Sequence, residues 1–244
     1  MIKQKHIAFV LIVLFFTSEF YSRVPPSGVA GRGYRFSFGP TLGFYSLKTK
    51  HAQNAVAKMS GLVDFKKEIN CDASHKIHFL FGGEYFFHGL NFKSYYFTQD
   101  TLQLYDKSFA FDYSVFIHEI NVPIQLKFSF TRENNSLFSS YIMVGYHFRV
   151  MLPANVKVSQ NGNVLQQSYE KLKFKIPFLG YYTNSFVSLT AGIQKNTVNH
   201  SKAGMFAELS YRYGFNQYSF QTKYSPSSLF INGSHLSLIV GIKF

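Results

Sequence analysis

Hydrophobic and polar residues alternate with a period of two through most of the chain after residue 34, and no window keeps a helical period for long. In the first such segment Phe36, Phe38, Leu42 and Phe44 are separated by small or polar residues. Successive side chains of a β-strand point to opposite faces, so this pattern predicts a strand with one apolar and one polar face. The same pattern predicts eight strands, at residues 36–44, 59–68, 77–88, 119–130, 141–149, 187–194, 205–213 and 236–244.

The connections between these strands are of two kinds, which alternate along the chain. Short segments with turn residues lie at 70–75, 132–137 and 196–201, and longer segments lie at 47–58, 90–112, 152–183 and 215–234. Outer-membrane barrels have short periplasmic turns and longer extracellular loops. The predicted fold is therefore all-β, an eight-stranded antiparallel transmembrane β-barrel over residues 35–244, with both chain ends of the barrel on the periplasmic side.

The two faces of the predicted strands differ in charge. A soluble sandwich or a lipocalin also alternates, but it points apolar side chains inward and charged ones outward. Here the charged residues share a face with glycines and serines, which suits the polar interior of a narrow barrel. The alternation fits either orientation; the N-terminal segment and the terminal Phe244 favour the membrane barrel.

The N-terminal segment predicts export. Lys3 and Lys5 precede an apolar run of ten residues at 7–16, which is too short to span about 30 Å of hydrocarbon as a helix. We therefore expect a signal peptide at residues 1–22, a flexible lead-in at 23–34, and a mature start between residues 19 and 31. The expected location is the bacterial outer membrane.

Composition agrees with strands at a membrane and leaves the partner open. Aromatic residues make up 19% of the chain, with 29 Phe, 17 Tyr and no Trp, and such side chains suit half-buried pleated surfaces and membrane interfaces. The net charge of +13 raises nucleic acid as a partner, but no nucleic-acid-binding motif accompanies it. We expect the basic residues to face water, lipid phosphate or anionic surface sugars, and no nucleic acid to bind.

The sequence predicts neither a cofactor nor a metal site. Cys71 is the only cysteine, so there is no disulfide framework, and we expect it to be a small buried residue. The nine histidines show no helical metal-ligand spacing, and no Asp-rich calcium loop occurs.

Several short strings in a fixed order carry a resemblance to a known family. They are residues 38–43 (Phe-Gly-Pro-Thr-Leu-Gly), Gly83-Glu84-Tyr85 followed by Gly89, residues 119–127, residues 208–214 (Glu-Leu-Ser-Tyr-Arg-Tyr-Gly) and the ending at 236–244. With these strings the chain resembles the PorT-like family of outer-membrane β-barrels over most of residues 35–244. The segment at 119–127 departs from the family's Glu-Ile-Pro-rich strand, because Asn121 and Val122 stand before Pro123.

The resemblance implies a barrel fold and a role as a component of type IX protein secretion, with other secretion-system membrane proteins as partners. Many members are small barrels of no assigned role. Phe244 resembles the C-terminal signal that the barrel-assembly machinery recognises.

The ionisable residues of the polar faces are the first candidate site. An eight-stranded barrel has an interior that side chains just fill, so a solute channel is not expected and charges inside must pair. We expect Glu84, Glu119 and Glu208 to meet Arg212, Lys127 or Arg149, with Lys243, His78, His88 and His147 nearby. Such a network stiffens the barrel; a proton relay or a gate is the functional alternative.

Two further hypotheses concern catalysis and the long connections. His235 and Ser237 share one strand face and are the one candidate base and nucleophile pair, for a lipid-modifying enzyme; the favoured prediction is that the chain is not an enzyme. Lys157, Lys171, Lys173 and Lys175 predict a basic extracellular hairpin that contacts lipopolysaccharide phosphates or an acidic partner. A non-secretory structural or adhesive barrel remains the third alternative.

Overall fold

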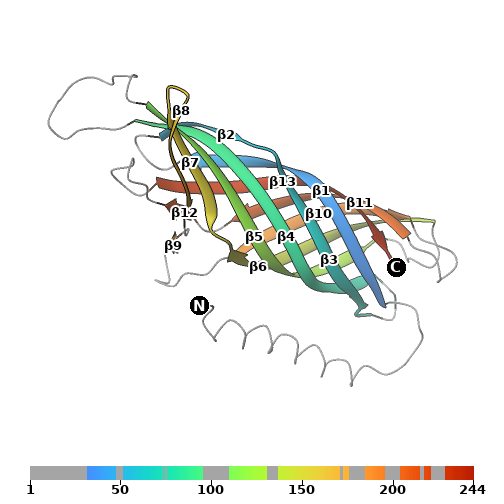
Figure 1. The fold of residues 1–244 in the computed structure, drawn as a ribbon. Coiled ribbons are helices and arrows are strands. Elements are labelled where there is room, and N and C mark those ends of the chain that lie inside the picture. Colours follow the sequence, from blue (N-terminus) through green and yellow to red (C-terminus); the bar gives the residue numbers. More distant parts are fainter. Residues whose placement is uncertain are drawn as a thin grey trace. The chain divides into compact units, whose positions relative to one another are not determined.

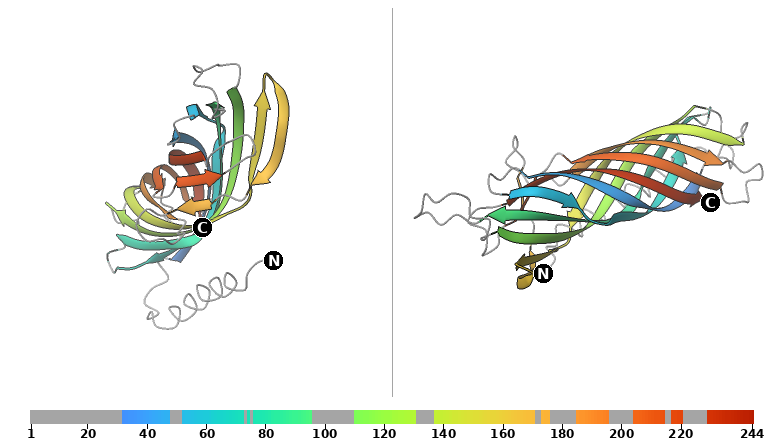
Figure 2. Two further views of the ribbon diagram at one scale, coloured as in Figure 1. Left: turned by 90° about the vertical axis from the view of Figure 1, so that its left-hand side faces the viewer. Right: turned by 90° about the horizontal axis from the view of Figure 1, so that it is seen from above.

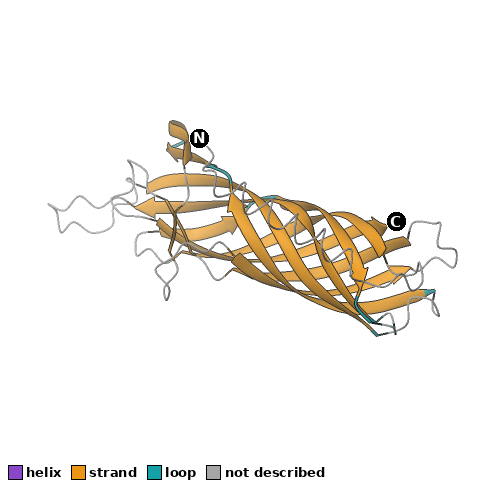
Figure 3. Cartoon of the chain, turned by 90° about the horizontal axis from the view of Figure 1, so that it is seen from below, coloured by secondary structure: helices purple, strands orange, loops and turns teal. Residues whose placement is uncertain are grey.

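A computed structural model describes residues 32–47, 52–72, 74, 76–95, 110–130, 137–170, 173–175, 185–195, 204–214, 217–220 and 229–244. These residues form strands and short loops, without a helix (Figure 3). Within those ranges, no helical segment has the length and apolar character needed for a membrane crossing. The strands are β1 (Arg32–Leu47), β2 (Ala52–Ala57), β3 (Ser60–Asn70), β4 (Ile77–Tyr95), β5 (Ala110–Ser129), β6 (Phe138–Met151), β7 (Ala154–Gln160), β8 (Asn163–Glu170), β9 (Lys173–Lys175), β10 (Ser185–Lys195), β11 (Gly204–Gly214), β12 (Gln217–Phe220) and β13 (Leu229–Lys243).

Eight of these strands close into a ring (Figure 1). The order around it is β1, β3, β4, β5, β6, β10, β11, β13 and back to β1, and every pairing is antiparallel. Phe38, for example, lies opposite Val63 of β3 on one side and opposite Val240 of β13 on the other. Closure pairs both edges of each strand, which removes the free edges that an open sheet would carry. The predicted eight-stranded antiparallel barrel is confirmed.

The outer face of the ring is apolar. Phe36, Phe38, Leu42 and Phe44 on β1 are 40% to 65% exposed, and the alternate residues of the other strands continue this band around the ring. Large apolar side chains exposed on every strand of a closed barrel are unfavourable in water and favourable in lipid. Because each strand of the ring is hydrogen-bonded to a neighbour on both sides, the strands can cross hydrocarbon. The chain is a transmembrane barrel of the outer-membrane type.

One end of the ring carries the short connections and the C-terminus (Figure 1). Phe244 and Tyr34 exchange two backbone hydrogen bonds of 2.8 and 2.9 Å, so the last residue extends the wall. In the turn between β3 and β4, Asp72 Oδ1 accepts hydrogen bonds from the backbone N–H of Lys76 and Ile77. Cys71 is exposed in this turn, so the expectation that it is buried is wrong; it follows the last residue of β3, where the wall ends.

The N-terminal prediction is only partly reached by the described residues. β1 begins at Arg32, inside the range predicted as a flexible lead-in, because Arg32 already pairs with Ile69 of β3. The predicted signal peptide, and the turns at 132–136 and 196–201, lie outside the described residues.

The other end carries strands where loops were predicted. β4 continues to Tyr95 and β5 begins at Ala110, β2 pairs with the extension of β4, and β12 pairs with β9 and β13. These extensions alternate as regularly as the ring strands, but they contain more polar residues on the outer face, so their apolar pattern is weaker. The prediction of long loops is therefore wrong in part, because strands within these segments extend the wall of the barrel at the end opposite the short turns.

A β-bulge joins β6 to β7. Glu119 lies opposite Met151, and Phe116 lies opposite Asn155. Between these two pairs β5 advances by three residues, whereas its partner advances by four, through Leu152 and Pro153. Proline has no N–H to donate to a ladder, and a bulge accommodates it. The extra residue turns the even-numbered side chains of β7 inward. β7 and β8 then form a hairpin at this end (Figure 2), closed by Asn161 and Gly162 with φ of 50° and 82°, as a two-residue turn of type I′ requires.

The lipid-facing band predicts a position-dependent cost for a charge. Leu209 lies mid-strand on the outer face of β11 and is 50% exposed. We expect Leu209→Arg to lower the free energy of unfolding by about 2–4 kcal/mol in lipid vesicles, measured by urea titration, because arginine is then forced into hydrocarbon. The matched control is Leu165→Arg on β8, beyond the ring, which is expected to change it by less than about 0.5 kcal/mol. Equal effects of the two substitutions would contradict the lipid-facing assignment.

Candidate functional site

The inner face of the ring is a dense arrangement of charged and polar side chains. Among the described residues, the buried charged set holds five cations and five carboxylates: Arg35, Lys66, Lys127, Arg149, Arg212, Asp64, Glu68, Glu84, Glu119 and Glu208. Equal numbers matter here, because an unpaired buried ion costs several kcal/mol. The strand alternation that puts apolar residues outward places all ten on the inside.

Glu68 of β3 is the centre of the layer nearest the short turns. Its Oε1 lies 3.0 Å from the Nζ atoms of both Lys127 and Lys243 and 3.1 Å from His78 Nδ1. Lys127 Nζ also donates to Gln194 Oε1 at 3.0 Å. Strands β3, β4, β5, β10 and β13 are therefore tied across the lumen through one carboxylate and its neighbours.

Arg35 of β1 links this layer to Glu208 of β11. The Arg35 guanidinium forms an ion pair with Glu208 and donates a 2.9 Å hydrogen bond to Tyr141 Oη, which itself donates to Glu208 Oε1 at 2.8 Å. The guanidinium carbon also lies 3.8 Å from the ring centroid of Phe206. Arg35 is thus held by a carboxylate, a phenol and an aromatic face.

A bidentate pair lies in the middle of the barrel. Arg212 of β11 donates to both oxygens of Glu84 on β4, at 2.7 and 2.8 Å, and Asn121 Nδ2 donates to Glu84 Oε1 at 2.9 Å. Two parallel hydrogen bonds fix orientation as well as charge. β4 and β11 are not neighbours in the ring, so this pair spans the lumen.

A third polar group lies toward the long connections. Glu119 accepts from His88 Nε2 at 2.9 Å through Oε1, and its Oε2 lies 3.1 Å from Arg149 Nε. The Tyr45 hydroxyl lies 2.9 Å from His88 Nδ1 and 3.3 Å from His235 Nε2. Carboxylate, imidazole and phenol therefore form one hydrogen-bonded chain from the lumen wall toward the extracellular end.

Beyond Tyr45 the inner face becomes apolar. The buried cluster consists of Leu90, Phe92, Phe111, Tyr113, Val115, Ile117, Ala154, Val156, Val158 and Ile231, with Tyr45 and Ala55 packed against it. The bulge between β6 and β7 lets β7 contribute to this cluster, because it turns Ala154, Val156 and Val158 inward. In the described part of the chain, side chains thus occupy the lumen: ionic and polar ones toward the short turns, and apolar ones toward the long connections.

The predicted lumen residues lie inside the barrel, but their partners differ in part. Glu84 meets Arg212 and Glu119 meets Arg149, whereas Glu208 meets Arg35 and Lys127 meets Glu68. The lumen set expected from the sequence omitted four of the buried charged residues: Arg35, Asp64, Lys66 and Glu68. All four carry the same signal as the others, since each lies on the polar side of an alternating strand.

The candidate catalytic pair is not assembled. Ser237 Oγ is bonded to Thr41 Oγ1 at 2.8 Å, and His235 is bonded to Tyr45, so both side chains have other partners. In the described ranges no group of three or more His, Cys, Asp or Glu is placed to hold a metal ion.

The predicted basic hairpin is divided between two places. Lys157 is exposed on β7, whereas Lys173 and Lys175 belong to β9, which pairs with β12 and not with β7 or β8 in the described structure. Lys171 lies outside the described residues. The three described lysines therefore do not lie in one hairpin, because Lys157 belongs to the β7–β8 pair and the other two to the β9–β12 pair.

Comparison with known proteins supports the fold. No protein-family model matches the sequence, and no curated protein matches it. The outer membrane protein OprG of Pseudomonas aeruginosa has 11% identity and a TM-score of 0.52, with 88% of this chain and 95% of that chain covered. Two further structures align more loosely. Neisserial surface protein A has 10% identity and a TM-score of 0.38, with 88% of this chain and 97% of that chain covered. The outer membrane protease OmpT of Escherichia coli has 7% identity and a TM-score of 0.35, with 91% of this chain and 99% of that chain covered. At these identities the likeness to OprG shows the fold alone, a small outer-membrane barrel.

The Glu84–Arg212 pair predicts a non-additive mutant cycle. Arg212→Ala leaves Glu84 buried without its main partner and is expected to lower the free energy of unfolding by about 3–5 kcal/mol. The double variant Glu84→Gln, Arg212→Met removes both charges and is expected to recover most of that loss. Urea titration of the barrel in detergent measures both. A double variant less stable than Arg212→Ala would show that the pair is not the unit that holds the lumen together.

Proposed function

We propose that this chain is a non-catalytic, non-conducting outer-membrane component of a protein secretion machinery, of the type IX kind implied by its resemblance to the PorT-like family. The observation that carries the proposal is the occupied lumen. Ions or solutes would have to displace several buried ion pairs and the apolar cluster above them. Each broken pair would cost several kcal/mol, so transport through the barrel is disfavoured and its outer surfaces are left to act.

The β7–β8 hairpin is the surface best suited to a partner protein. β8 ends the strand order of the sheet, so its second edge has no strand partner among the described residues. Val164, Leu165 and Tyr169 on β8 are 51%, 38% and 74% exposed. β8 has no proline or lysine of the kind that commonly blocks an exposed edge, and an extended segment of another protein can add to such an edge.

The two alternatives have weaker support. A lipid-modifying enzyme needs an assembled nucleophile and base, and Ser237 and His235 have separate partners. An adhesive barrel would use the same β7–β8 hairpin, so an experiment is needed to separate the two functions, adhesion and secretion.

A complementation series tests the secretion role. A deletion strain is supplied with the native chain, with the double variant Leu165→Asp, Tyr169→Asp, or with the control Leu137→Asp, an exposed position near the short turns. We expect the deletion strain to lose its exported proteins from the medium and the hairpin variant to restore none of them, while the control restores export. Outer-membrane amount and the heat-dependent gel shift of each barrel establish that it is folded.

Normal export by the deletion strain would contradict the proposed function. Normal export with lost attachment to surfaces would favour the adhesive barrel. Normal export by the hairpin variant alone would place the contact elsewhere on the barrel.

A further inference from the structure

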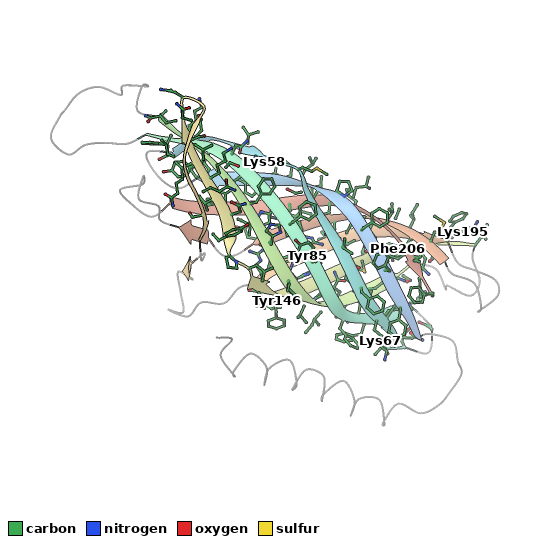
Figure 4. All side chains as sticks on the ribbon, in the orientation of Figure 1. Lys58, Lys67, Tyr85, Tyr146, Lys195 and Phe206 are labelled. Carbon is green, nitrogen blue, oxygen red and sulfur yellow. The ribbon has the colours of Figure 1, made fainter. Side chains whose placement is uncertain are left out.

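Lys58 is held across the outer face of the barrel at its extracellular end (Figure 4). It lies between β2 and β3, and its backbone N–H donates to the carbonyl of Gly89 on β4 at 2.8 Å. Its side chain passes over β4 to β5, where Nζ donates to Ser114 Oγ at 2.7 Å and lies 4.7 Å from the ring centroid of Phe116. A lysine fixed at both ends in this way is pre-organised, unlike an ordinary surface lysine.

Gly89 provides the space that this arrangement needs. A Cβ atom at residue 89 would lie 3.1 Å from Lys58 Cβ and 3.0 Å from the nearest ring atom of Phe116. Glycine inside a strand weakens it and commonly marks a close approach of another group. Here the missing side chain lets Lys58 and Phe116 lie against each other over β4.

Lys157 brings a second positive charge to the same part of the outer face. It lies on β7 directly opposite Ser114, is exposed, and has no acidic partner in the described part of the chain. Desolvation and then the charge of Lys157 lower the pKa of Lys58, as two neighbouring ammonium groups require. Of the acidic residues whose side chains are described, Asp112 alone lies on this outer face, and it pairs with Lys93 at 3.7 Å.

The position of this group matches the headgroup level of the bilayer. Met59 next to Lys58 is 84% exposed and Ile120 on β5 is 47% exposed, so the apolar band ends at Phe116. Above that level the outer face of β5 is polar, with Ser114 and then Asp112. Lysines at such a boundary lay their carbon chains on apolar surface and present the ammonium group to lipid phosphates.

We propose that Lys58, Ser114 and Lys157 form a binding site for a phosphate group of a glycolipid in the outer leaflet. Both ammonium groups donate to phosphate oxygens and the Ser114 hydroxyl completes the contact, while Phe116 and Met59 contact the acyl chains below. Phosphate relieves the repulsion between the two lysines, because the one carboxylate described on this face, Asp112, is paired with Lys93. The site does not depend on the secretion role, and each can fail without the other.

The test is a lipid titration of the folded barrel in detergent, read by native mass spectrometry. The probes are lipid A with two phosphates, the same lipid after dephosphorylation, and inorganic phosphate. We expect the native protein to prefer the phosphorylated lipid, and Lys58→Gln and Lys157→Gln each to weaken its binding about tenfold, the effect of losing one charge-assisted hydrogen bond. Lys58→Arg is expected to retain most of the binding.

Lys195→Gln is the matched control, because Lys195 is an exposed lysine at the opposite end of the barrel (Figure 4). It should leave lipid binding unchanged. Lys157 is exposed, so its substitution keeps the barrel folded, and a heat-dependent gel shift verifies this for every variant. Equal binding of the two lipids, or unchanged binding by both glutamine variants, would overturn the site. Displacement of lipid A by an equal concentration of inorganic phosphate would overturn its assignment to a lipid.

Discussion

Closure of an eight-stranded ring forces ten charged side chains into a space that side chains alone fill, and the pairing of those charges is the constraint on which the structure depends. The outer face cannot take them, because it lies against hydrocarbon. The interior can hold these charged side chains only if each one is paired with a group of opposite charge. Glu68 satisfies this with two lysines and a histidine, and Glu84 with a bidentate arginine from the opposite side of the ring.

The lumen has two parts because the barrel has two environments. Within the membrane the strands need an apolar outside, and the polar residues collect inside. Beyond the membrane β4, β5 and β7 face water on their outer side, so their apolar residues turn inward and form the cluster around Val115 and Val156. The bulge at Leu152 and Pro153 marks the change on β6 and β7. The same change on the outer face leaves Lys58 and Lys157 at the boundary, where a phosphorylated lipid is proposed to bind.

The sequence predicts the ring well and its upper part poorly. Alternation in β1, β5 or β13 is strong because one face meets lipid, whereas β2, β8 and β12 are short and their outer faces are polar, so the same period is hard to distinguish from a loop. Alternation also shows which residues face inward, but not which of them meet. Arg212 and Glu84 are 128 residues apart in the sequence and lie on strands that are not adjacent in the ring, so only register and closure bring them together. Arg35 shares the polar face of β1 with Ser37, a signal that was present and unused.

The most direct test of the account uses three consecutive aromatic residues of β4. Tyr85 and Phe87 point toward lipid, and Phe86, which is 1% exposed, points into the lumen. The chain has no tryptophan, so Tyr85→Trp, Phe86→Trp and Phe87→Trp each introduce a single tryptophan, whose fluorescence can be excited selectively over that of tyrosine, with a modest change of shape. In vesicles of brominated lipid the account predicts strong quenching for the first and third substitutions and little for the second. Similar quenching at all three positions, or strongest quenching at residue 86, would contradict a barrel with an apolar outside and an occupied interior.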